Sequence, residues 1–253
     1  MPEIVKFKAF CLERYKYAHN LRGSEALNLF KQYGVMEYID SFYDVLHTFG
    51  DKYIVANIHE FIEAEIKNKN RRIFMNTKKI NPRELQGNVF DLIGDKWMLI
   101  TPSKSAKYPG FNSMTASWGS MGIMWGKPVA NCVIRPVRYT YDFMEAAECF
   151  TLSFFPEKYR DAMNVFGKKS GRDCDKLALA KEHGLEPYTS GNGNETEKGL
   201  WFFAEADITL VCRKIYYQDI DPANFIDKDI DKNYPNKDYH RMYTGEIIDV
   251  RVK

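Results

Sequence analysis

Three short segments combine residue types that could hold a planar, phosphorylated molecule. The first is FNSMTASWGSMG, residues 111–122, in which small polar and apolar side chains alternate. This alternation directs one set of side chains to each face of a strand, and Gly119 and Gly122 allow a sharp turn or a close approach to a ligand. Hydroxyls beside exposed backbone amides suit the edges of a heteroaromatic ring. A barrel strand that ends in a glycine bulge is the alternative interpretation.

The second segment, RPVRYTYDF, starts at Arg135, where a predicted strand gives way to a predicted helix. Thr140 is a candidate N-cap, and the free N–H groups of a helix N-terminus attract anions. Arg135 and Arg138 add forked donors that suit a phosphate. The alternative is that both arginines pair with surface carboxylates such as Asp142 and Glu145.

The third segment, FGKKSGRDCDK, starts at Phe166 and places a glycine on each side of a Lys-Lys-Ser core. It has the character of a phosphate-gripping turn that leads into a helix. It is not a Walker A loop, because the order of lysine and glycine differs from G-x-x-x-x-G-K-[ST]. A solvated basic turn is the alternative. Together the three segments supply a ring-binding edge and two anion-binding corners, a combination that fits a mononucleotide.

The elements that must position these segments follow from hydrophobic periodicity. Short runs rich in β-branched and aromatic residues predict strands at 88–93, 96–102, 127–136, 149–155, 200–220 and 245–252. Helical patterns interrupt them at 140–148, 156–166 and 173–183. The mixture predicts an α+β fold, an antiparallel barrel or sandwich with added helices, rather than a parallel βαβ array.

The first 68 residues differ from the rest because they contain only helical patterns. Apolar residues at steps of three and four predict four short helices that close a small bundle, the last of them over 53–66. A basic linker is predicted at 69–79, with an RNA- or anion-binding arm as the alternative. The domain beyond it is predicted to cover 80–253.

Composition limits the class of protein. The chain has 253 residues, 45% hydrophobic and 28% charged, with a formal net charge of +2, which gives no global attraction to nucleic acid or lipid. We therefore expect no nucleic-acid or membrane partner and a cytoplasmic location. Five scattered cysteines without a C-x-x-C pair suggest buried apolar side chains, neither a metal site nor a disulfide framework.

Residues from about 80 to 252 resemble the flavin reductase-like, FMN-binding split-barrel family, in particular its flavoredoxin-type branch. The similar stretches are INPRELQGNVFDLIGDKWMLIT, FNSMTASWGSMGIMWGKPVANCVIRPVRYTYDFME, FTLSFFPEKYRDAMNVFGKKSGRDCDK and NYPNKDYHRMYTGEI. The resemblance implies an antiparallel split barrel that forms a homodimer, with one FMN near each subunit interface. Residues 1–68 lie outside this family and resemble a helical domain of unknown function, which we expect to bind a protein partner.

The resemblance also implies roles for individual residues. It assigns His240, before the last strand, to the open face of the flavin, where it would guide a nicotinamide or another electron partner; a histidine satisfied by its neighbours is the alternative. The remaining implied cofactor-binding residues fall in the three segments: Asn112, Met114, Thr115, Ala116, Ser117 and Trp118 for the ring, Arg135, Arg138, Tyr139 and Thr140 for the phosphate, and Lys168, Lys169, Ser170 and Arg172 for a second phosphate-side loop.

The implied activity is an FMN oxidoreductase that takes hydride from NADH or NADPH. The first alternative is an FMN electron carrier or redox sensor without its own nicotinamide reaction, and the second is an adaptor in which the barrel is incidental. A pyridoxamine phosphate oxidase-like activity is a lesser alternative. The sequence departs from the flavin reductases in a long polar segment at 216–242, which would narrow access to the flavin.

Overall fold

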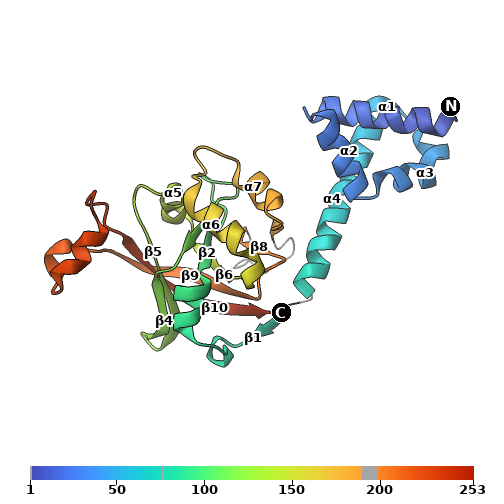
Figure 1. The fold of residues 1–253 in the computed structure, drawn as a ribbon. Helices are drawn as coiled ribbons and strands as arrows, with labels where there is room; N and C mark the ends of the chain where they lie inside the picture. The colour runs from blue at the N-terminus through green and yellow to red at the C-terminus, as the bar shows by residue number, and fades with distance from the viewer. Residues whose placement is uncertain (1, 76, 190–198) are drawn as a thin grey trace. The chain divides into compact units, whose positions relative to one another are not determined.

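A computed structural model describes residues 2–75, 77–189 and 199–253 (Figure 1). The chain divides into two compact units, Met1–Arg72 and Ile73–Lys253. Each unit is described by itself below. None of the helices in the described part of the chain has the length and apolar character required to cross a bilayer.

The first unit is a bundle of four helices. Its core is built from one apolar stripe on each helix, as the periodicity predicted. The last helix is longer than the sequence pattern indicated, because Lys and Arg are good helix formers and no proline occurs between Ile66 and Pro82, so the helix continues after its apolar stripe ends. The helices are α1 (Glu3–Ala18), α2 (Gly23–Gln32), α3 (Val35–Leu46) and α4 (Asp51–Met75).

The second unit is an antiparallel split barrel with added helices, which confirms the predicted fold class. One sheet has the strand order β3-β2-β6-β9-β10-β5-β4, with β1 paired to β10, and β7 and β8 form a separate pair. The strands are β1 (Lys78–Ile80), β2 (Met98–Pro102), β3 (Met114–Ala116), β4 (Gly119–Met124), β5 (Lys127–Ile134), β6 (Cys149–Phe154), β7 (Pro187–Thr189), β8 (Trp201–Phe203), β9 (Ile208–Asp219) and β10 (Arg241–Val252).

Helices cover one part of this sheet and bring the predicted segments near one another. α6 packs against β2 and β3, and α5 packs against β2. The helices of the barrel unit are α5 (Tyr139–Ala146), α6 (Arg160–Lys168) and α7 (Lys176–Glu182), with short turns at Pro82–Glu84, Glu157–Tyr159, Pro222–Asn224 and Lys228–Asn233.

The predicted strand at 88–93 is wrong, because this segment is helical and continues as a π-helical turn over Asp91–Lys96. The side chain of Asn88 accepts a hydrogen bond from the backbone N–H of Phe90, as a helix-capping residue does. Leu92 and Ile93 are buried while Phe90 is 85% exposed, so the apolar residues follow one helical face rather than a strand.

The barrel core leaves no space at one glycine of β10. A Cβ added at Gly245 would lie 2.6 Å from both the Cβ of Cys212 and the ring of Phe150. Cys132, Cys149 and Cys212 are buried in or beside this core, as the sequence predicted for cysteines that act as small apolar side chains. Burial raises the pKa of the Cys132 thiol to about 12.

Candidate functional site

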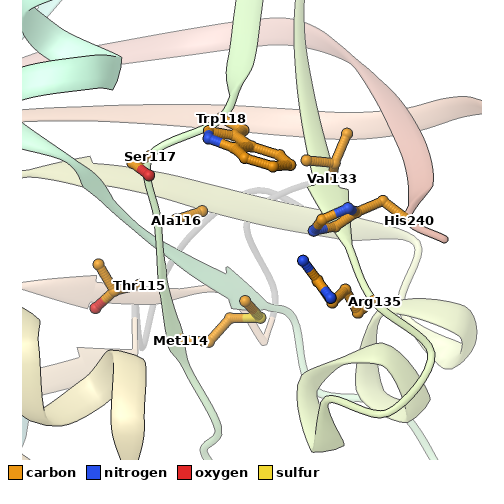
Figure 2. Close-up of a pocket in the computed structure, with 8 residues that line it drawn as sticks. All are labelled: Met114, Thr115, Ala116, Ser117, Trp118, Val133, Arg135 and His240. Atoms are coloured by element: carbon orange, nitrogen blue, oxygen red, sulfur yellow. The ribbon is translucent and has the colours of Figure 1, made fainter. Parts of the chain in front are cut away.

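A cavity of about 270 Å³ lies along the segment that joins β3 to β4. Figure 2 shows the backbone of this segment on one side of the space, with Val133, Arg135 and His240 facing it from the other. Trp118, 45% exposed, extends over the space between the two sides. The lining residues are Met114, Thr115, Ala116, Ser117, Trp118, Val133, Arg135 and His240.

A second cavity, of about 610 Å³, adjoins the first at Ser117 and Trp118. Its other wall is the helical segment that was predicted to be a strand, including Phe90 and Ile93. This wall is apolar, whereas the wall of the first cavity that faces the β3–β4 segment contains Arg135 and His240. A flat ligand in the two cavities would therefore meet polar side chains on one side of Trp118 and apolar side chains on the other. Apolar walls with a few polar groups are usual for a small-molecule site.

His240 closes the first cavity just before β10 begins. It is 9% exposed, and its Nδ1 lies 2.9 Å from the hydroxyl oxygen of Tyr234. Burial, followed by the positive charge of Arg135, lowers the pKa of His240 to about 4, against the smaller opposing effect of Asp238. The imidazole is therefore neutral at neutral pH. The alternative interpretation was that neighbouring residues satisfy the hydrogen-bonding groups of His240. This is the case for Nδ1.

Arg135 lines the cavity but is already engaged by the segment between β9 and β10. Its guanidinium donates to both carboxylate oxygens of Asp238, at 2.9 and 3.0 Å, and to the carbonyl of Asn233 at 2.8 Å. The carboxylate partner is thus Asp238, not the Asp142 or Glu145 that the sequence suggested. Arg135 therefore has fewer N–H donors left to bind a phosphate than the sequence predicted.

Arg138 connects all three predicted segments. Its Nη2 donates to the carbonyl of Gly167 at 2.7 Å, and a Cβ added at Gly167 would lie 3.6 Å from the Cβ of Thr115. The hydroxyl of Thr115 donates to the carbonyl of Met163 in the same helix. Burial, followed by the charge of Arg135, lowers the pKa of Arg138. No carboxylate of the described chain pairs with it, so its charge is available to an anion.

The start of α5 and the turn after α6 lie against Asn112. The Asn112 side chain, 2% exposed, donates from Nδ2 to the hydroxyl of Thr140 at 2.9 Å. Gly171 approaches so closely that an added Cβ would lie 2.4 Å from Oδ1 of Asn112 and 3.0 Å from the ring of Tyr139. Glycine is therefore required at this position to bring the basic turn against α5.

The other residues of the basic turn are more exposed. Lys168 and Lys169 are exposed, and Ser170 accepts a hydrogen bond from the backbone N–H of Arg172. Arg172 lies over the ring of Tyr139 at 4.8 Å and pairs with Asp142 at 3.1 Å. Arg172 is thus held by a surface ion pair with Asp142, the carboxylate that the alternative interpretation had assigned to Arg135 and Arg138. Seven of the predicted residues line the first cavity, and the other eight lie in the segments around this neighbouring corner, where Lys168 and Lys169 are exposed.

Lys176 is a residue of the corner that sequence reasoning missed. It is 4% exposed, its Nζ donates to the carbonyl of Phe166 at 3.3 Å, and no carboxylate of the described chain pairs with it. Burial lowers its pKa to about 8, and Arg138 adds to the shift while Cys174 opposes it. The one sequence signal was its spacing, because Lys176 shares a helix face with the buried Leu179 and Ala180.

Two basic side chains that have no acidic partner within the described chain, a close-packed glycine turn and a cavity beside β3 together form a candidate site for a flat anionic ligand on an antiparallel split barrel. The chain belongs to the family described as flavin reductase like domain, whose model matches residues 96–253. Residues 6–65 match the model of a family described as protein of unknown function (DUF3791). None of the curated proteins matches the sequence.

Several solved structures are similar to the chain. The FMN-binding domain of a flavin reductases-like enzyme from Shewanella baltica is 18% identical, with a TM-score of 0.48 over 70% of this chain and 77% of that one. Flavoredoxin from Methanosarcina acetivorans is 18% identical, with a TM-score of 0.46 over 67% and 74%. The NADH:FAD oxidoreductase of Streptomyces globisporus is 14% identical, with a TM-score of 0.44 over 63% and 78%.

Proposed function

We propose that this chain is an FMN-binding oxidoreductase that transfers hydride between a nicotinamide nucleotide and the flavin. The observation that carries the proposal is the meeting of Thr115, Gly167 and Arg138, which joins the ring-binding strand to a cationic corner. Membership of the flavin reductase like domain family supports the same conclusion.

The residues of the site fit FMN in both charge and shape. Among the residues that the structure describes, the half-buried Arg138 and the buried Lys176 have no acidic partner, and the first turn of α5 offers N–H groups to the same anion. The strand from Met114 to Trp118 would hold the ring. Bound FMN would supply the hydride-accepting chemistry, and the protein would supply position and charge.

The chain's own groups assist in two ways. Backbone N–H groups of the segment from Thr115 to Trp118 can stabilise the negative charge that a reduced ring acquires. His240 stays neutral, so it adds a hydrogen-bonding group without adding a charge that would compete with Arg135. No general acid or base is required for hydride transfer in this arrangement.

The test is anaerobic reduction of FMN-loaded protein. NADH or NADPH is expected to abolish the visible flavin absorbance within the time of one turnover. Loaded protein that neither nucleotide reduces would instead favour the electron carrier. Protein that cannot take up FMN would contradict both and favour the adaptor.

The affinity for FMN is expected to depend on pH through Lys176. An anion beside the ammonium favours its charged form, so binding raises its pKa from about 8 and takes up a proton above that pH. FMN binding at pH 9 is therefore expected to be up to about tenfold weaker than at pH 7. Calorimetric titrations in two buffers of different ionisation enthalpy measure the proton uptake. Lys176→Met should bind FMN with no proton uptake; an unchanged uptake in this variant would contradict the assignment.

We also propose that the barrel unit forms a homodimer. Large apolar side chains are exposed where β4 turns into β5 and on the adjacent part of β9, among them Ile123 (58%), Trp125 (60%) and Tyr216 (41%), whose ring centroid lies 5.7 Å from that of Trp125. An exposed apolar patch of this kind is typical of an interaction surface. The resemblance to dimeric split barrels supports a second copy as the partner.

Trp125→Glu is expected to convert the dimer to a monomer, raising the dissociation constant by at least about 100-fold because a charge replaces a large apolar contact. Light scattering after size-exclusion chromatography measures the mass. Tyr17→Glu is the control, because Tyr17 is 85% exposed on the helical unit. A wild-type protein that is monomeric at all concentrations would refute the dimer.

We assign no chemical reaction to the helical unit, Met1–Arg72. Its exposed apolar side chains Phe42, Val45, Phe49 and Tyr53 support the proposal that it binds a protein partner.

A further inference from the structure

The segment between β9 and β10 contacts two side chains that line the first cavity, Arg135 and His240. Tyr234, 3% exposed, contacts Nδ1 of His240 through its hydroxyl at 2.9 Å. The guanidinium of Arg135 lies 5.1 Å from the centroid of the Tyr234 ring and pairs with Asp238. One segment therefore sets the positions of both Arg135 and His240 in the lining of the cavity.

The contact with Tyr234 determines which nitrogen of His240 carries its hydrogen. Among the residues that the structure describes, the Tyr234 hydroxyl has no other hydrogen-bond partner. If Nδ1–H were the donor, the phenolic hydrogen would be buried without an acceptor, which is unfavourable. The hydroxyl therefore donates to Nδ1. Because the imidazole is neutral, its hydrogen then lies on Nε2.

Nε2 faces the ligand side. Figure 2 shows the outer nitrogen of the His240 ring directed toward the space between Trp118 and Arg135. The charged groups that act on the ring are Arg135, at the end of β5, and Asp238, in the same segment as Tyr234. They are paired with each other, so the ring presents a neutral N–H donor next to a compensated cation.

We propose that Tyr234 is a positioning residue that fixes His240 so that its Nε2–H donates a hydrogen bond to a carbonyl oxygen of a planar ligand in this cavity. The identity of the ligand rests on the proposed function. The carbonyl belongs either to the FMN ring or to the carboxamide of a nicotinamide, and the experiments below separate the two sources.

The direct test is the tautomer of His240 in the full-length protein labelled with ¹⁵N-histidine. Long-range ¹H–¹⁵N correlation spectra are expected to show a protonated Nε2 and a free Nδ1 from about pH 5 to pH 8. His240→Gln identifies the signal. Tyr234→Phe keeps the ring over Arg135 but removes the hydroxyl, and should mix the tautomers and raise the pKa of His240.

Tyr239→Phe is the matched control. Tyr239 lies in the same segment and packs on Tyr234, but its hydroxyl donates to Asp231. This variant should leave the tautomer and the titration of His240 unchanged. A protonated Nδ1 in the wild-type protein, or a Tyr234→Phe spectrum identical to the wild type, would overturn the proposal.

Binding measurements identify the carbonyl. An increase of about fivefold in the FMN dissociation constant of Tyr234→Phe, the size expected for one neutral hydrogen bond, would place it on the flavin. An equal increase in the KM for NADH or NADPH, with kcat and FMN affinity unchanged, would place it on the nicotinamide. If neither constant changes, the proposal is wrong. Failure of the wild-type protein to bind FMN refutes the proposed function, while the spectra still decide the tautomer.

Discussion

Replacing Arg138 by glutamine is expected to weaken FMN binding by roughly 10- to 100-fold, because a charge-assisted hydrogen bond to a phosphate contributes roughly 1.5–3 kcal/mol. Arg138 is well placed for this contact, since it is half-buried and the one hydrogen bond that its guanidinium makes within the described chain goes to the carbonyl of Gly167. Quenching of flavin fluorescence during titration of the apo-protein measures the dissociation constant.

Two further arginines provide the comparison. Arg213→Gln removes the same charge from a side chain paired with Glu246 on the sheet, and should leave FMN affinity unchanged. Arg172→Gln removes an exposed pair with Asp142 and should have an effect of only a few-fold. Equal losses in all three variants would show that net charge, rather than the corner around Arg138, determines binding.

Gly245→Ala is expected to destabilise the barrel unit by about 3 kcal/mol, at the upper end of the range for overpacking a core. The new Cβ would lie 2.6 Å from Cys212 and from the ring of Phe150, and both neighbours are fully buried and cannot move aside. The midpoint of thermal unfolding should fall by roughly 6–12 °C.

Tryptophan fluorescence follows this transition selectively, because all four tryptophans of the chain lie in the second unit, beyond residue 72. Gly122→Ala is the control, since nothing lies within 4 Å of the added Cβ, and its free energy of unfolding should change by less than about 0.5 kcal/mol. If Gly245→Ala were as stable as Gly122→Ala, the packing of β10 against β9 and β6 would differ from the structure described here.

Local sequence pattern was sufficient wherever one periodicity dominated. The run CFTLSF is buried at every position and forms β6, and α7, capped by Asp175, lies within the helix predicted at 173–183. The pattern failed at 88–93, where six residues fit a short strand or a helical turn equally well and only burial against the barrel decides between them. Likewise, the end of α4 was misplaced because the apolar stripe stops before the helix does.

In the candidate site, too, the sequence pattern predicted some residues and missed others. The three segments could be identified because small, basic and glycine residues cluster in each of them, and the fold brings Thr115, Gly167 and Arg138 together. Tyr234 could not be identified and Lys176 had only its helical spacing as a signal, because a buried lysine and a tyrosine that contacts a histidine look like ordinary surface residues in sequence. Their importance arises from neighbours more than five residues away or from burial alone.

The cysteines in and beside the barrel core have a chemical consequence. Burial raises the thiol pKa of Cys132, Cys149 and Cys212, so these sulfurs remain protonated at neutral pH. Peroxides and alkylating reagents attack the thiolate, and they also need access to it. Oxidants that form beside a reactive cofactor would therefore leave these three sulfurs unmodified until the barrel unfolds, and the rate of their modification is a measure of how often it does so.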